Sequence, residues 1–402
     1  MVYASLARLA EAALRLRAGI GNNAALRQRL VLDLAPQPAA SQPAELWVHG
    51  ASVGELVSAR PIIETLARDM TVLVTANTPT GRDMAAGWGL PARLAPLDMP
   101  AALNRFLDAV QPRLALTIEG EFWPLRSRLL AARGVRQAMI GARISARSAA
   151  RWGRLPGLIG PVLGRIEALS AQDGDSLARL RGLGLRQDAI MPPMNLKLLA
   201  PAATPAPTDD PARDRVWLAA STHEGEEGPV LDAYMDARAA CPDLRLILAP
   251  RHPRRGDEVA ALIAARGLEV ARRSRGADQA PLLLADTLGE MARWYARAGI
   301  CLVGGSLSDR GGHTPWEPAA WRCAILHGPH VSNHADGFAA LHDAAAAQLV
   351  DRPDLAAAVT RLARDHAQAR AMGHAARDLL DRLAGDPAPL LARLRDLAQG
   401  DK

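Results

Sequence analysis

Short apolar runs alternate with helix-like segments in this chain, and the alternation occurs twice. In the first half the apolar runs read ELWVHG, TVLVT, LALTI and QAMI, starting near residue 45. In the second half they read RVWLAAS, LRLILAP, PLLLAD, GICLVGG and AILHG. Strands that alternate with helices at this spacing form parallel sheets built from β-α-β units. The sequence therefore predicts an α/β fold with two Rossmann-like halves.

The segment between the two halves has a different composition. Residues 200–213 are rich in Pro, Ala and Asp and have no periodicity, which is typical of an interdomain linker. We therefore expect an N-terminal domain at 1–199, a linker at 200–213, and a C-terminal domain at 214–402 that ends in a helical tail. Because open parallel sheets bind ligands beyond the carboxyl ends of their strands, we expect the two sheets to face a central cleft.

The composition excludes several classes of protein. Hydrophobic residues make up 49% and charged residues 22%, which is typical of a globular chain. Aromatic residues reach only 3%, too few for the stacking platforms of single-stranded nucleic-acid binders, so we expect no nucleic-acid partner. The net charge of +6 favours some anionic partner. The three cysteines form no C-x-x-C motif, which argues against a zinc site and fits a cytoplasmic setting.

The N-terminal segment predicts an amphipathic helix at about residues 3–18. Its apolar residues lie at helical spacing: Leu6, Leu9, Ala13 and Leu16. Charged residues interrupt the apolar character, so we expect neither a signal peptide nor a membrane span. Two interpretations stay open: a helix packed on its own domain, or a helix that lies on a membrane surface.

The loop after the first apolar run contains Ser52-x-x-Glu55, which matches a capping box. In this interpretation Ser52 caps a helix and Glu55 reaches back to it. A second interpretation makes Glu55 a general base, which the helix dipole would keep ionised. Both interpretations stay open at this point.

Similar boxes follow other predicted strands, and we expect them to place several helix N-termini around one ligand. They are Ser221-x-x-Glu224, Thr287-x-x-Glu290 and Thr314-x-x-Glu317, the last with Pro315 at the first helical position. The glycine pairs 304–305 and 311–312 would allow a sugar or nucleotide to approach the backbone closely.

Three further loops carry charged residues. Glu119 and Glu121 follow LALTI, and we expect at most one of them to face the cleft. Pro250 and Arg251 end LRLILAP, either as a ligand contact or as a solvated turn. Lys197 is one of only two lysines among 48 basic residues, and a compact ammonium differs from a guanidinium at a tight anion contact.

These motifs give the chain a resemblance to the 3-deoxy-D-manno-octulosonic acid (Kdo) transferases, which move Kdo from CMP-Kdo to a lipid A precursor in lipopolysaccharide biosynthesis. The matching segments are Ser52–Glu55, Thr78–Gly81, Phe122–Pro124, Arg143–Ser148, Ser221–Glu227, Pro250–Pro253, Leu288–Glu290 and Gly304–Pro318. The resemblance implies a GT-B fold and an inverting glycosyltransferase without a metal or a cofactor. It also implies a peripheral position on the cytoplasmic face of the inner membrane, with CMP-Kdo and the lipid A precursor as partners.

The resemblance also implies roles for individual residues. It makes Glu55 the catalytic base, and it makes Glu119 and Lys197 the groups that stabilise the transition state. It places the CMP contacts at Pro250, Arg251, Leu288, Gly289, Glu290, Thr314, Pro315, Trp316 and Glu317, with Glu317 as the ribose ligand. Lys197, Arg251 and the helix N-termini would then stabilise the departing phosphate.

The chain departs from the family pattern at three places. Thr314 stands where the family usually has Asn, Pro193-Met194 where it has two small residues, and Gly120 where it has Ser or Thr. Two alternatives therefore accompany the expected function. One is a GT-B transferase for another nucleotide-activated sugar, and the other is a non-catalytic GT-B protein that binds a nucleotide or glycolipid.

Overall fold

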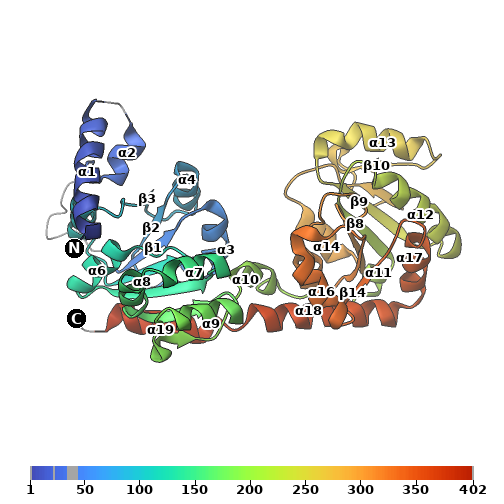
Figure 1. Cartoon of the computed structure of the whole chain (residues 1–402). Helices are drawn as coiled ribbons and strands as arrows, with labels where there is room; N and C mark the ends of the chain where they lie inside the picture. The colour runs from blue at the N-terminus through green and yellow to red at the C-terminus, as the bar shows by residue number, and fades with distance from the viewer. Residues whose placement is uncertain (1, 21–22, 34–43, 401–402) are drawn as a thin grey trace. The chain divides into compact units, whose positions relative to one another are not determined.

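The chain forms two compact units, each built around its own parallel sheet. The computed structural model describes residues 2–20, 23–33 and 44–400 (Figure 1). The first unit comprises Met1–Ala200 together with Ala384–Lys402, and the second comprises Pro201–Leu383. The predicted α/β class with two Rossmann-like halves is confirmed.

The first unit contains a seven-stranded sheet in the order β3-β2-β1-β4-β5-β6-β7, and every pair in it is parallel. Its central strands are apolar and buried because helices cover both faces, as parallel sheets require. The strands are β1 (Leu46–Gly50), β2 (Val72–Ala76), β3 (Ala92–Leu94), β4 (Leu114–Ile118), β5 (Arg136–Ala142), β6 (Ile166–Ala171) and β7 (Ile190–Met191).

Eleven α-helices and one short 3-10 helix, η1 (Gln187–Ala189), are described around this first sheet. The α-helices are α1 (Val2–Ile20), α2 (Ala24–Arg29), α3 (Val53–Leu66), α4 (Pro79–Gly87), α5 (Pro100–Val110), α6 (Pro124–Ala132), α7 (Ala146–Gly153), α8 (Pro156–Leu163), α9 (Gly174–Gly182), α10 (Leu196–Ala202) and α19 (Ala388–Gln399). The last two residues of α10 already belong to the second unit.

The second unit repeats the architecture with a parallel sheet in the order β10-β11-β9-β8-β12-β13-β14. Its strands are β8 (Val216–Thr222), β9 (Arg245–Pro250), β10 (Ala271–Arg272), β11 (Leu282–Leu284), β12 (Ile300–Val303), β13 (Ala324–His327) and β14 (Ala347–Leu349). Its α-helices are α11 (Pro211–Asp214), α12 (Glu227–Ala240), α13 (Gly256–Ala264), α14 (Met291–Arg297), α15 (Trp316–Ala320), α16 (Ala335–Asp343), α17 (Leu355–Arg364) and α18 (His366–Ala384). Three 3-10 helices complete it: η2 (Pro253–Arg255), η3 (Arg273–Arg275) and η4 (Ser332–His334).

The C-terminal helix does not belong where the sequence placed it. We expected the tail to complete the C-terminal domain, but α19 packs against α3, β4, β5 and β6 of the first unit. Its apolar residues Leu390, Leu394 and Leu397 are buried in the same core as Leu116 and Ile140. The tail's helical periodicity predicted a buried stripe, but periodicity does not specify which surface covers that stripe.

Hydrogen bonds hold the segment of the expected linker against the second unit. Arg213 is buried and donates a hydrogen bond to the carbonyl of Ala298 at 2.7 Å. Arg377 of α18 donates to the carbonyls of Ala202 and Thr204, each at 2.8 Å. A Pro- and Ala-rich composition removes regular structure, but it leaves carbonyl groups free to accept such bonds.

The position of α19 gives a test that separates the two assignments. Leu394 is fully buried in the first unit, so Leu394→Ala should destabilise that unit by about 2–5 kcal/mol. Hydrogen exchange followed by mass spectrometry should show faster exchange in β1, β4 and β5, with β8 and β12 unchanged. Leu383→Ala is the matched control, since Leu383 is 41% exposed at the end of α18. Loss of protection in β8 and β12 alone would contradict this assignment.

Candidate active site

In the first unit, the candidate residues follow the carboxyl ends of neighbouring strands. Glu55 lies in the first turn of α3, directly after β1, and Glu119 follows β4. Because β1 and β4 are adjacent parallel strands, their following loops meet at one edge of the sheet. The structure therefore brings Glu55 and Glu119 together.

The capping box at the start of α3 is confirmed. The Ser52 hydroxyl accepts a hydrogen bond from the Glu55 backbone N–H at 3.3 Å and donates to Glu55 Oε1 at 3.1 Å. Glu55 Oε2 accepts a hydrogen bond from the backbone N–H of Ala51 at 2.7 Å. These bonds hold the Glu55 carboxylate in one orientation at the helix N-terminus.

The environment of Glu55 makes its carboxylate a better proton acceptor than an ordinary glutamate. Burial raises its pKa, and the negative charges of Glu119 and Glu121 raise it further, while hydrogen bonds from Ala51 and Ser52 lower it. We expected the helix dipole to keep the group ionised, but desolvation and the neighbouring carboxylates outweigh the cap. A carboxylate with a raised pKa is suited to general-base catalysis near neutral pH.

Glu119 and Glu121 have different surroundings. Glu119 has a backbone φ of 59°, in the left-handed region that a glutamate rarely adopts, and its carboxylate forms no hydrogen bond or ion pair with any described residue. The Glu121 carboxylate accepts hydrogen bonds from Trp123 Nε1 at 2.7 Å and from Asn77 Nδ2 at 3.4 Å. The two carboxylates therefore have different surroundings, and because Glu119 itself is left-handed, the backbone from Glu119 to Glu121 is not extended.

A buried hydrogen-bond chain below Glu121 was not assigned from the sequence. Trp47 Nε1 donates to the Thr75 hydroxyl at 2.8 Å, and that hydroxyl lies 3.0 Å from His49 Nδ1. His49 Nε2 lies 3.5 Å from Glu121 Oε2. Burial lowers the pKa of His49 to about 4, so the imidazole is neutral near pH 7. The position of His49 near the end of the first predicted strand was the available signal.

The hydrogen bonds of this buried network also explain why Glu121 is ionised. Burial alone would raise the pKa of Glu121, but hydrogen bonds from His49 and Trp123 and the charge of Arg126 lower it to about 2. Glu121 therefore stays ionised and contributes to the raised pKa of Glu55.

Lys197 lies in the second position of α10 and is exposed. The preceding residue, Leu196, packs against Gly141, whose φ of 58° lies in the left-handed region; a Cβ there would come within 2.6 Å of Leu196 Cδ1. The adjacent carbonyl of Ile140 accepts a hydrogen bond from the backbone N–H of Glu119 at 3.0 Å. These contacts place Lys197 at the same sheet edge as Glu119, and its ammonium has no partner within the described part of the chain.

In the second unit, the residues expected to contact CMP follow β9, β11 and β12. Arg251 follows β9, is exposed, and its backbone N–H donates to the carbonyl of Thr222 in β8 at 2.9 Å. Its guanidinium has no hydrogen-bond or ion-pair partner among residues 44–400. Glu317 in α15 accepts a hydrogen bond from the Tyr295 hydroxyl at 3.3 Å. Burial raises the pKa of Glu317, although the bond from Tyr295 and the charge of Arg251 lower it.

The loop Leu288–Glu290 precedes α14 at the same sheet edge. Leu288 is 78% exposed, whereas Glu290 is bound by two arginines. Arg273 donates to Glu290 Oε1 at 2.8 Å, and Arg293 donates to the same oxygen at 3.2 Å. Hydrogen bonds from Arg273 and Thr287 lower the pKa of Glu290 to about 2. Glu290 therefore holds its loop in place, and the exposed part of that loop is Leu288 and Gly289.

The capping boxes expected in the second unit are wrong. Helices α12 and α14 begin one residue after Glu226 and Glu290, without a side-chain cap. At α15 the Thr314 hydroxyl accepts from the backbone N–H of Trp316 at 3.4 Å, and Pro315 is the N-cap residue rather than the first helical residue. The box pattern specifies a spacing, and that spacing also occurs where carboxylates bind arginines or other backbone groups.

Glu226 is the residue in this unit that sequence analysis missed. Its buried carboxylate accepts hydrogen bonds from four backbone N–H groups, those of His223, Gly305, Leu307 and Ser308, at 2.7–3.1 Å. It thereby fixes the loop after β12 against the loop after β8. The run of three acidic residues in HEGEE, directly after a predicted strand, was the available signal.

The glycines of the β12 loop serve close packing within the protein. A Cβ at Gly304 would come within 2.3 Å of the carbonyl oxygen of Ser221, and one at Gly311 would meet Asn333. Contacts within the protein therefore account for Gly304 and Gly311, and the expected approach of a sugar or nucleotide to these loops stays a prediction. His223 and His313 lie beside Gly305, with their Nε2 atoms 2.9 Å apart.

Across residues 2–20, 23–33 and 44–400, no group of three or more His, Cys, Asp and Glu side chains could hold a metal ion. Within the same residues, no helix combines the length and the apolar character that crossing a bilayer would need.

Comparison with known proteins identifies relatives of this chain. Residues 24–200 match the family model of the 3-deoxy-D-manno-octulosonic-acid transferases (kdotransferases). The chain is 36% identical to the 3-deoxy-D-manno-octulosonic acid transferase of Bordetella pertussis, over 90% of this chain and 89% of that protein. It is 32% identical to the enzyme of that name from Haemophilus influenzae, over 74% of this chain and 73% of that protein.

A solved structure supports the fold. MurG from Acinetobacter baumannii superposes with a TM-score of 0.51 at 12% identity, covering 88% of this chain and all of that one. The fold is therefore GT-B-like. From the level of identity and the coverage, this chain belongs to the 3-deoxy-D-manno-octulosonic acid (Kdo) transferase family.

Proposed function

We propose that this Kdo transferase activates the acceptor hydroxyl with Glu55 and binds the nucleotide of CMP-Kdo through the loops of the second unit. Membership of the family makes the chain a glycosyltransferase that moves Kdo from CMP-Kdo in lipopolysaccharide biosynthesis. The observation that carries the proposed base is the Glu55 carboxylate, which two neighbouring carboxylates and burial make a better proton acceptor. The acceptor we propose is a lipid A precursor.

The reaction we propose is a single displacement with inversion at the anomeric carbon. Glu55 takes the proton from the acceptor hydroxyl as its oxygen attacks that carbon, and the bond from the carbon to the CMP phosphate breaks. Glu119, whose carboxylate has no protein partner among the described residues, stabilises the positive charge that develops on the sugar. Lys197 and Arg251 balance the negative charge of the leaving phosphate.

The nucleotide site we propose lies at the carboxyl ends of β9, β11 and β12. Arg251 would contact the phosphate, and Pro250 would shape the turn that presents it. The Glu317 carboxylate would accept hydrogen bonds from the ribose hydroxyls. Exposed Leu288 and Gly289 would contact the base, with Glu290 holding their loop, and the segment Thr314, Pro315 and Trp316 would complete the contact.

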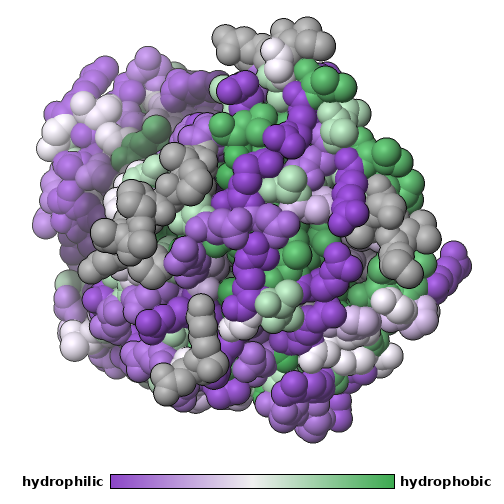
Figure 2. Space-filling model, turned by 90° about the vertical axis from the view of Figure 1, so that its left-hand side faces the viewer, coloured by the Kyte–Doolittle hydropathy of each residue, from purple (hydrophilic) through white to green (hydrophobic). Residues whose placement is uncertain are grey.

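The acceptor is a lipid, and we propose that α1 holds the enzyme on an anionic membrane surface. Leu6, Leu9 and Leu16 of α1 are 62–71% exposed, so the apolar stripe does not face the protein. The opposite side of α1 is fixed, because Glu11 is buried and accepts a hydrogen bond from the backbone N–H of Ala101 at 2.8 Å. Figure 2 shows apolar surface interspersed with hydrophilic side chains on one face of the molecule. An exposed leucine face beside arginines is typical of interfacial helices.

Replacing Glu55 separates its role as a cap from its role as a base. Glu55→Gln keeps the acceptor for the Ala51 N–H but cannot take a proton, so the transfer rate should fall by roughly 10²–10⁴ while CMP binding persists. Ser52→Ala is the matched control: it should cost about 1 kcal/mol of stability yet retain most of the transfer rate. The measurements are Kdo transfer from CMP-Kdo, CMP affinity and the thermal midpoint. A near-normal transfer rate in Glu55→Gln would show that Glu55 is not the catalytic base.

The pH profile gives an independent check on the same group. Because the pKa of Glu55 is raised, kcat/KM should fall on the acidic side at a pH above the ordinary glutamate value of 4.5. Glu119→Gln removes one of the charges that raise this pKa, so its residual activity should have an acidic limb at lower pH.

Lys197→Arg tests whether a compact ammonium is required. If Lys197 contacts the leaving phosphate, the bulkier planar guanidinium should lower kcat by about tenfold or more. The thermal midpoint should not change, because Lys197 is exposed and its side chain has no partner among the described residues. An Arg variant that retains the full rate would show that only a positive charge, or nothing, is needed at this position.

The exposed face of α1 is tested by changing three leucines together. In the triple variant, glutamine replaces Leu6, Leu9 and Leu16. Its binding to anionic vesicles, measured by sedimentation, should be weaker by about tenfold or more, since each leucine buries apolar surface in the membrane. Transfer to acceptor dispersed in detergent should not change. Leu349→Gln, at a leucine of the second unit that is 50% exposed, is the control. If the unmodified protein does not bind anionic vesicles at low salt, α1 has only a structural role.

A further inference from the structure

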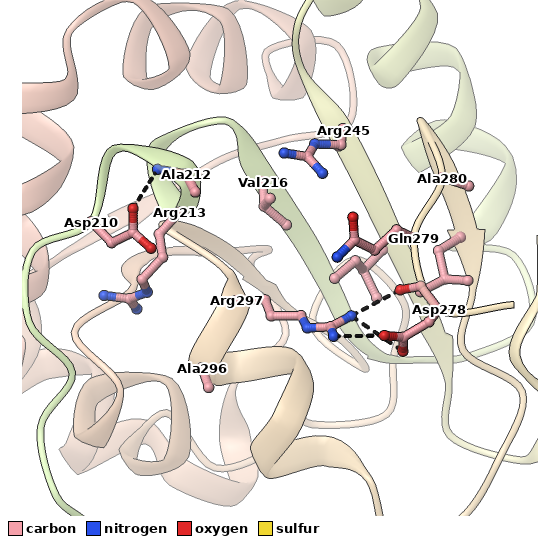
Figure 3. Close-up of a pocket in the computed structure, with 12 residues that line it drawn as sticks. Asp210, Ala212, Arg213, Val216, Arg245, Asp278, Gln279, Ala280, Ala296 and Arg297 are labelled. Carbon is pink, nitrogen blue, oxygen red and sulfur yellow. Dashed lines mark hydrogen bonds and ion pairs between the residues drawn. The ribbon is translucent and has the colours of Figure 1, made fainter.

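The second unit contains a cavity of about 320 Å³ that the proposed reaction does not use (Figure 3). Its walls include Val216 and Arg245, which are the first residues of β8 and β9. The nucleotide loops follow the opposite, carboxyl ends of the same strands. The cavity therefore lies at the other edge of the sheet from the proposed donor site.

Arg245 supplies an uncompensated positive charge to this cavity. Its side chain is partly buried, and its guanidinium has no hydrogen-bond or ion-pair partner in the described part of the chain. Figure 3 shows Arg245, Gln279 and Arg297 pointing from different elements toward the same space. A guanidinium that is partly removed from water and has no partner favours an oxyanion, which it can bind with two parallel hydrogen bonds.

The two acidic residues at the cavity, Asp210 and Asp278, bind groups other than Arg245. Asp278 Oδ2 accepts from Arg297 at 2.9 Å, and its Oδ1 accepts from Arg293 at 2.5 Å. Asp210 Oδ1 accepts a hydrogen bond from the backbone N–H of Ala212 at 2.8 Å. Asp210 keeps its negative charge, but neither carboxylate forms a hydrogen bond or an ion pair with Arg245 in the described part of the chain.

A second buried arginine lines the same cavity. Arg213 is only 8% exposed, and its Nε has no hydrogen-bond partner in the structure. Its terminal nitrogen is held by the carbonyls of Ala298 and Trp321. Figure 3 shows the Arg213 guanidinium pointing away from Arg245 and Gln279, so we assign Arg213 no contact with the ligand.

The rest of the lining is apolar. Val216, Ile247 and Leu283 contribute branched side chains from three strands, and alanines come from the surrounding segments. A cavity with apolar walls and a few polar groups is typical of a small-molecule site, and its volume lies at the lower end of that range.

We propose that this cavity binds a small ligand that carries a carboxylate or a phosphate monoester on an apolar skeleton. The oxyanion binds Arg245, with Gln279 as a further hydrogen-bond donor, and the skeleton packs against Val216, Ile247 and Leu283. This site is separate from the donor site, and its occupancy does not depend on the proposed catalytic roles.

The proposal is tested by fluorine NMR with three small probes on the full-length protein. 4-Fluorobenzoate and 4-fluorophenyl phosphate carry the two candidate anions, and 4-fluorobenzamide is the neutral isostere of the first. We expect saturable binding of at least one anion and much weaker binding of the amide. Equal binding of the amide, or no saturable binding of either anion, would overturn the proposal.

Variants locate the binding. Arg245→Gln should lower the affinity for the anionic probe by about tenfold or more, because a charge-assisted hydrogen bond is lost. Arg382→Gln, at an exposed arginine of α18 outside the cavity, should leave binding unchanged. Ala296→Phe should block the probe by filling the cavity, and unchanged thermal midpoints show that each variant folds. Unchanged affinity in Arg245→Gln overturns the proposal, and so does displacement of the probe by CMP, which would place it in the donor site.

Discussion

Every strand pair in both sheets is parallel, and this constraint decides where functional side chains can gather. Parallel strands are joined by crossover helices, so the residues after each strand meet at a single edge of the sheet. In the first unit, that edge collects Glu55, Glu119 and Lys197. In the second unit, it collects Arg251, the Leu288–Glu290 loop and Glu317. The two sets of residues come from loops far apart in the sequence, and strand direction alone brings each set together.

Polar groups that are fully paired hold these edges rigid. Glu226 satisfies four backbone N–H groups of two loops, and the chain from Trp47 through Thr75 and His49 fixes Glu121. Burying a carboxylate costs free energy unless it is hydrogen-bonded, so these bonds stabilise one loop conformation over others. Three of the groups that have no partner among residues 2–20, 23–33 and 44–400 are the ones that the proposed mechanism assigns to the substrates: Glu119, Lys197 and Arg251.

The sequence predicted most of the architecture because strand and helix periods are local properties. It located the start of α3 correctly at Ser52, where the spacing of cap and carboxylate coincides with a real helix end. It failed at Ser221, Thr287 and Thr314, where the same spacing serves other bonds. It also could not identify Glu226 or His49, because their partners lie in other loops and appear only once the sheet is formed. The sequence also could not predict that the pKa of Glu55 is raised, because the main cause is burial, and burial depends on the folded structure.

The return of α19 to the first unit has a consequence for synthesis. The core of the first unit includes Leu390, Leu394 and Leu397, which are synthesised after the whole of the second unit. At a translation rate of roughly 5–20 residues per second, the second unit takes about 10–40 s to synthesise. During that interval the first sheet is present on the ribosome without the helix that covers part of it. The core of the first unit therefore cannot be completed until Leu390, Leu394 and Leu397 have been synthesised, after the whole of the second unit.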